Sequence, residues 1–157
     1  MNKFESPRFF KSSNEVILVI LQFLIIVLHF IKFEFLPKMI IIPVNFFFSL
    51  IGLLIILIAS IVMLIAIKDL GSNLSPFPRP IANGNLITSG IYRIIRHPMY
   101  YSLILISLGV FIINFTIYYL ILTITLAFII KFKIILEDQY LNNKYKNFVL
   151  YKDKVKY

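Results

Sequence analysis

The side chains of this chain that could do chemistry gather in one short segment. Arg96 and His97 stand directly before Pro98, and Tyr92 and Tyr100 flank them. Proline suits the first position of a helix, because its missing N–H would have no partner there. The following turn would then open its N–H groups beside cations, as in carboxylate and phosphate sites, and the rings could stack on a base or attract a cation. The alternative is simple anchoring at a membrane surface.

A second candidate set follows later in the chain. Lys133 and Glu137 are four residues apart, which places them on one face of a helix, and Asp138 is next to Glu137. They could be no more than a helix-stabilising pair, although a Lys that precedes a Glu is the less favourable order for that purpose. His29 lies in an apolar run, and we interpret it as an interfacial or interhelical hydrogen-bonding residue rather than a catalytic one.

The composition shows what surrounds these residues. Of 157 residues, 60% are hydrophobic, whereas a soluble domain is about 45 to 50% apolar, so we expect an all-α integral membrane protein. The chain has no Cys, which excludes disulfides and thiolate nucleophiles, and two lone His residues do not make a zinc site, so no metal is expected. We expect a single domain over residues 1–157.

Uncharged runs define the spanning segments. The run 98–130 has 33 uncharged residues, about 50 Å of helix against a hydrocarbon core near 30 Å, so it must turn, and Asn114 and Thr116 could break it. Lys and Arg number three in 1–15, two in 32–43, four in 68–97 and seven in 131–157. The positive-inside rule then favours a hairpin and a multi-pass protein with both termini cytoplasmic. The predicted spans are 16–36, 44–67, 98–113 and 116–131.

Two polar segments join or follow these spans. Residues 68–97 form a predicted cytoplasmic loop, in which the prolines between Ser75 and Pro80 forbid helix. Residues 132–150 carry apolar or aromatic side chains about three to five apart, which predicts an amphipathic C-terminal cytoplasmic helix.

The polar segment resembles a known family signature. Residues 86–100 read L-I-T-S-G-I-Y-R-I-I-R-H-P-M-Y and resemble the L-V-T-S-G-x-Y-x-x-x-R-H-P-x-Y of the isoprenylcysteine carboxyl methyltransferase family. Residues 70–76 look like its L-G-x-x-x-S-P, residues 133–138 like its R-x-x-x-E-E, and residues 141–155 like its aromatic tail. Three positions depart from the family: Lys133 replaces Arg, which keeps the charge but loses the bidentate grip, Asp138 replaces Glu, and Lys146 replaces Gly.

The resemblance implies an S-adenosylmethionine-dependent membrane methyltransferase, related to membrane phospholipid methyltransferases. Its acceptor-side and catalytic residues would be Lys133 and Glu137. Its cofactor contacts would be Gly84, Asn85, Leu86, Ile87, Tyr92, His97, Pro98, Met99 and Tyr100. Membrane sterol reductases share a similar C-terminal region, but the chain is short for their additional spans.

The acceptor is open at this stage. A lipid-like or prenylated carboxylate, as in isoprenylcysteine O-methylation, is the preferred substrate because a cation lies where the resembling family has Arg; Lys133 would hold it. An ethanolamine phospholipid is the alternative, and it would need Glu137 or Asp138 as a base or cation partner. A third hypothesis is a non-catalytic basic protein that binds anionic lipid. We expect the lipid bilayer as a partner, no nucleic acid and no obligate protein partner.

Overall fold

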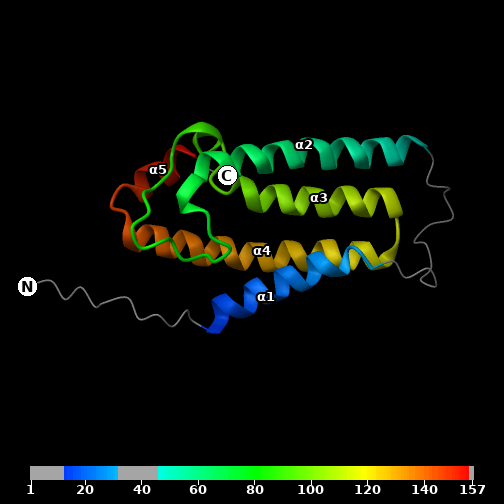
Figure 1. Cartoon of the computed structure of the whole chain (residues 1–157), viewed down its shortest axis with the longest axis horizontal. Helices are drawn as coiled ribbons and strands as arrows, with labels where there is room; N and C mark the ends of the chain where they lie inside the picture. The colour runs from blue at the N-terminus through cyan, green and yellow to red at the C-terminus, as the bar shows by residue number, and fades with distance from the viewer. Residues whose placement is uncertain (1–12, 32–45, 156–157) are drawn as a thin grey trace, which may run out of the picture.

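The fold is a set of long apolar helices with the polar loop at one end. The computed structural model describes residues 13–31 and 46–155, and every regular element in these two ranges is a helix. The helices α2, α3 and α4 lie side by side along the long axis, and α1 crosses α4 (Figure 1). Their bounds are Ser13–Leu28 for α1, Phe46–Leu70 for α2, Pro98–Asn114 for α3, Ile117–Lys144 for α4 and Phe148–Lys154 for α5, with short 3-10 helices η1 at Gly71–Asn73 and η2 at Gly90–Arg93.

The closest helix contact is between α2 and α3, and glycine makes it possible. A Cβ atom on Gly52 would lie 2.7 Å from the carbonyl oxygen of Gly109, and one on Gly109 would lie 2.8 Å from that of Gly52. Any larger residue at either position would push the helices apart. Close approach through small residues is how helices associate in lipid, where there is no hydrophobic driving force between them.

The turn expected at Asn114 is confirmed. Phe115 follows α3 in the left-handed region (φ 46°), and the Thr116 hydroxyl accepts a hydrogen bond from the backbone N–H of Tyr119 at the start of α4. Asn114 donates its side-chain N–H to the carbonyl of Val110. The helices α3 and α4 on either side of this turn pack against each other, so residues 98–130 form a helical hairpin, as the excess length of this run predicts.

Two predicted boundaries are wrong. The first span was expected to reach residue 36, but α1 ends at Leu28 and its last turn tightens, because Tyr118 donates to the Leu28 carbonyl and the His29 ring bonds to the carbonyl of Ile25; residues 32–36 lie outside the described part. The separate helix over 132–150 does not exist. With no Gly or Pro between Ile117 and Lys144, α4 continues unbroken to Lys144, and the chain turns at Tyr145 before α5.

The helices support a membrane protein. Two stretches of the described chain, Phe46–Asn73 and Ile117–Lys144, are long and apolar enough to cross a bilayer, whereas α1 and α3 are apolar but shorter. At 16 and 17 residues, α1 and α3 are about 25 Å long, short of a hydrocarbon core near 30 Å. Four crossings and cytoplasmic termini therefore stay predictions.

Candidate active site

The polar loop is fixed to the bundle where α2 ends and α3 begins. Gly90 adopts a left-handed conformation (φ 57°), and a Cβ atom there would lie 2.0 Å from the Asp69 carboxylate. That carboxylate accepts the N–H of Ile91 (2.8 Å), and the Tyr92 hydroxyl reaches the Ala66 carbonyl (3.4 Å). The loop therefore returns along α2, which brings Arg96 and His97 to the start of α3 beside the end of α4.

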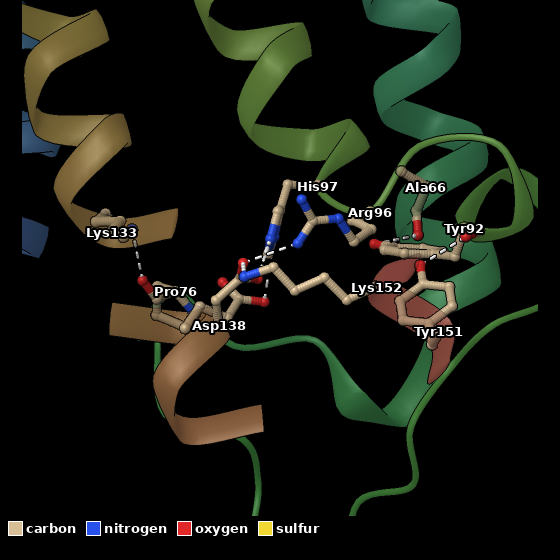
Figure 2. Close-up of polar contacts among 10 residues, drawn as sticks. Ala66, Pro76, Tyr92, Arg96, His97, Lys133, Asp138, Tyr151 and Lys152 are labelled. Atoms are coloured by element: carbon tan, nitrogen blue, oxygen red, sulfur yellow. Dashed lines mark hydrogen bonds and ion pairs between the residues drawn. The ribbon is translucent and has the colours of Figure 1, made fainter. Parts of the chain in front are cut away.

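Asp138 joins three parts of the chain at this point. Its carboxylate accepts hydrogen bonds from Arg96 (2.8 Å) and from His97 Nε2 (2.9 Å), and it lies 3.1 Å from the Lys152 ammonium (Figure 2). These contacts link the loop, α4 and α5. The sequence indicated Asp138 only as a second acid beside Glu137. Its three partners could not be recognised there, because they lie in other segments of the chain. We call these four residues the Asp138 cluster.

Two tyrosines brace the loop against α5. The Tyr151 hydroxyl donates to the Tyr92 carbonyl (2.6 Å), and both side chains are buried (Figure 2). Burial raises the pKa of Tyr151 to about 12, and burial, with the nearby Glu137 charge, raises the pKa of Tyr92 well above the ordinary value of 10. Both phenols therefore stay protonated and remain donors at neutral pH.

Lys133 reaches α1 and the proline segment of the loop. Its ammonium donates to Gln22 Oε1 (2.6 Å) and to the Pro76 carbonyl (2.9 Å), and only 1% of the residue is exposed. It also lies 5.1 Å from the centre of the Tyr100 ring. Two of its three N–H groups thus donate hydrogen bonds to protein oxygens.

A second set of contacts repeats this arrangement two helical turns away. Glu15 on α1 accepts from Arg79 (3.0 Å) and from the Tyr140 hydroxyl on α4. Glu15 and Gln22 are seven residues apart, as are Lys133 and Tyr140, so the antiparallel helices α1 and α4 form a two-rung ladder that holds residues 76–79. Gln22, Glu15 and Arg79 were missed in the sequence, where no local pattern pairs them.

A cavity opens between this ladder and the Asp138 cluster. Of the predicted cofactor residues it is lined by Asn85, Leu86, Ile87, Tyr92, His97, Met99 and Tyr100, and both predicted acceptor residues, Lys133 and Glu137, lie on its wall. Residues some fifty positions apart in sequence are thus brought to one space.

Gly84 and Pro98, although described by the structure, do not line this cavity. The Gly84 carbonyl accepts from the Tyr145 hydroxyl (2.6 Å), and a Cβ atom there would lie 2.3 Å from Asn73 Oδ1. Pro98 is buried at the first position of α3, as predicted, but the N–H groups of Tyr100 and Tyr101 donate to the His97 carbonyl. Most of the N–H groups that were expected to be open in this first turn therefore already have a partner.

Burial distinguishes this site from a membrane-surface belt. His97 is 5% exposed and Tyr92 7% exposed, so neither side chain reaches out to headgroups. The His97 ring stacks on Tyr100 at 5.8 Å, and its Nδ1 lies 3.8 Å from Glu137 Oε1. Aromatic faces and a carboxylate attract a positively charged sulfonium, and the aromatic rings can also stack on a nucleoside base. With the apolar walls, the residues present therefore fit S-adenosylmethionine.

His29 takes the interhelical role expected of it. Its Nδ1 donates to the Ile25 carbonyl (2.8 Å), and its Nε2 lies 2.7 Å from the Ser107 hydroxyl on α3. Ser107 in turn lies 2.8 Å from the Thr123 hydroxyl on α4. These three residues, the His29 cluster, connect α1, α3 and α4.

Comparison with known proteins gives one assignment. A family model described as phospholipid methyltransferase matches residues 47–147, which is more than half of the chain. The matched range runs from α2 through α4 and includes the loop, whereas α1 and α5 lie outside it. No curated protein and no solved structure gives a significant match.

Proposed function

The chain belongs to the phospholipid methyltransferase family, and on that premise we propose that it transfers a methyl group from S-adenosylmethionine to the amine of a phospholipid headgroup. The observation that carries the proposal is the common cavity, where the loop residues that resemble a cofactor site and the two acceptor residues of α4 line one space. A transfer reaction needs both reactants side by side.

When bound, S-adenosylmethionine would supply a methyl group on a positively charged sulfur, which would leave as a neutral thioether once the lone pair of the acceptor took the methyl group. We assign Asn85, Leu86 and Ile87, with the rings of Tyr92 and Tyr100, to its binding. The Asp138 cluster contributes to cofactor binding indirectly, because Asp138 holds the His97 ring in place against Tyr100. Orientation and exclusion of water are what such a displacement asks of a protein.

Glu137 is assigned to the acceptor. A protonated headgroup amine has no lone pair, so a base has to take one proton before the new bond can form. Glu137 lies on the cavity wall, with its Oε1 atom 3.8 Å from His97 Nδ1. It can pair with the ammonium as the headgroup enters and accept the proton as the amine reacts.

The carboxylate acceptor preferred from the sequence is the second candidate, because the Lys133 cation does line the cavity. Its ammonium, however, already donates to Gln22 and Pro76. That engagement favours Lys133 as a residue that positions the loop, and together with the family match it moves our preference to the amine.

Radiolabelled methyl transfer by the purified chain tests the proposal. We expect label in phosphatidylethanolamine, little in a prenylcysteine carboxylate, and a loss of at least tenfold in Glu137→Gln that deepens at lower pH, with Asp153→Asn on α5 as the matched control. Label in the carboxylate alone would establish the second candidate. Failure of the folded protein to bind S-adenosylmethionine would reject the methyltransferase proposal and leave lipid binding without catalysis.

A further inference from the structure

A second groove lies next to the cavity, and all of the charged side chains that line it are basic. Basic side chains from η2, from the end of α4, from the turn that follows it and from α5 line it: Arg93, Lys144, Lys146 and Lys154. Among the described residues on its wall there is no Asp or Glu. We call it the basic groove.

The carboxylates of Asp138 and Asp153 do not line this groove. Asp138 already contacts Arg96, His97 and Lys152, as described above. Lys144 donates to the carbonyls of Ile81 and Gly84, which fixes its position without cancelling its charge. Asp153 is exposed on α5 but does not line the groove. The groove therefore attracts anions.

Exposed apolar side chains stand beside these cations. Ile94 is 72% exposed, Val149 53% and Leu150 63%, and Leu150 itself lines the groove. On α5 the opposite face is buried, through Phe148 and Tyr151. An element with one face packed on the protein and a mixed apolar and basic outer face suits the boundary between headgroups and acyl chains.

The position of the groove along the bundle agrees with this. The elements that carry its lining residues include η2 and α5, and α5 lies at the end of the bundle where the apolar helix α2 stops and α3 starts (Figure 1). In a chain with membrane-crossing helices, the ends of these helices are at headgroup level. A free anion would need the cations only, whereas a phospholipid also uses the apolar rim.

We propose that the basic groove binds the phosphate of an anionic phospholipid, as a site separate from the methyl-transfer cavity. The two spaces share Leu86, Tyr145 and Tyr151 as a common wall but not their charged residues. The cavity has Arg79, Arg96, Lys133 and Glu137, and the groove has the four cations above. The groove thus selects lipid by net charge, independently of what the cavity methylates.

Lipid association in bilayers tests this proposal without reference to enzyme activity. The full chain is reconstituted in phosphatidylcholine, and the immobilised fraction of spin-labelled phosphatidylglycerol is compared with that of spin-labelled phosphatidylcholine. We expect a severalfold preference for the anionic lipid, since a basic residue near the surface contributes about 1 kcal/mol. Lys146→Gln and Lys154→Gln should each weaken the preference, and their combination should bring it close to one.

The control is Lys131→Gln, which removes the same charge from an exposed position of α4 about 20 Å along the helix from Lys144. It should keep the preference, with sodium chloride arms at matched ionic strength correcting for screening. An unchanged preference in the double variant, or an equal loss in Lys131→Gln, would overturn the site. Displacement of the labelled lipid by inorganic phosphate, beyond the chloride effect, would instead identify a free-phosphate site and overturn the lipid assignment.

Discussion

Two polar clusters among the helices differ in charge and in what they face. The His29 cluster is made of hydroxyls and one ring, and each of its members bonds to a neighbouring helix. The Asp138 cluster gathers a carboxylate and basic side chains, and its His97 lines a cavity. The first holds helices together, whereas the second holds a wall of the cavity.

The difference shows how buried polar residues in a membrane protein can be sorted. A hydroxyl network costs little to desolvate and contributes a modest amount to packing, on average about 0.6 kcal/mol per interaction. Burying charges is expensive unless each is paired, so a charged cluster suggests a functional demand beyond stability. Of these two clusters, the Asp138 cluster meets that description, and it adjoins the cavity between segments that resemble a catalytic family.

Removal of the Asp138 charge should have the largest effect. Asp138→Asn leaves Arg96, His97 and Lys152 without their common anion. The loss of one partner costs on the order of 3 to 5 kcal/mol in a fully buried pair, and less here because Lys152 is half exposed. We expect cofactor binding to be lost and the thermal unfolding temperature in detergent to fall. Asp153→Asn is the control, and equal behaviour of the two variants would mean that the Asp138 cluster is only a surface ion network.

Changes at Lys133 come next and separate its two possible roles. Lys133→Met leaves Gln22 Oε1 and the Pro76 carbonyl unpaired, at about 1 to 3 kcal/mol for each buried group. Gln22→Met breaks the same bond without a charge change. If Lys133 positions the loop, both variants should raise KM, and the double variant should cost less than their sum. If it holds an acceptor carboxylate, Gln22→Met should be mild, and Lys133→Arg should retain activity.

The His29 cluster should show a smaller effect that is confined to stability. Ser107→Ala removes the hydroxyl between His29 and Thr123 and should cost about 0.5 to 1.7 kcal/mol. Activity per folded molecule and cofactor affinity should stay at the wild-type level, measured by calorimetry beside thermal unfolding. A fall in affinity comparable to that of Asp138→Asn would remove the distinction between the two clusters.

A similarly small effect is expected at Tyr151. Tyr151→Phe removes the donor to the Tyr92 carbonyl and should cost about 1 kcal/mol at neutral pH. Because the folded pKa is raised to about 12 from an ordinary value of 10, the folded state keeps its proton longer, and this stability is complete below pH 10 and is lost as pH rises toward 12. The difference in unfolding free energy between variant and wild type should therefore narrow above pH 10. A gap that stays constant would contradict the bond.

Local patterns predicted most of the fold. The uncharged runs locate α2, α3 and the start of α4, and the polar pair Asn114 and Thr116 locates the turn, because helix length and capping depend on neighbouring residues. The same kind of reasoning failed at residues 132–150. An amphipathic pattern reports a helix face but not where one helix ends and the next begins, and nothing in that sequence stops α4 before Lys144.

The sequence by itself determined that this is an apolar helical chain with its candidate site residues around Pro98 and in α4, since composition, spacing and motif resemblance are all readable along the chain. Only the tertiary structure decided how these residues are used. The partner of Lys133 is Gln22, 111 positions away, and the partners of Asp138 come from the loop and from α5. The physical reason is that a buried charge takes whichever oxygen or cation the packing of helices brings within about 3 Å, and that choice has no signature in the local sequence.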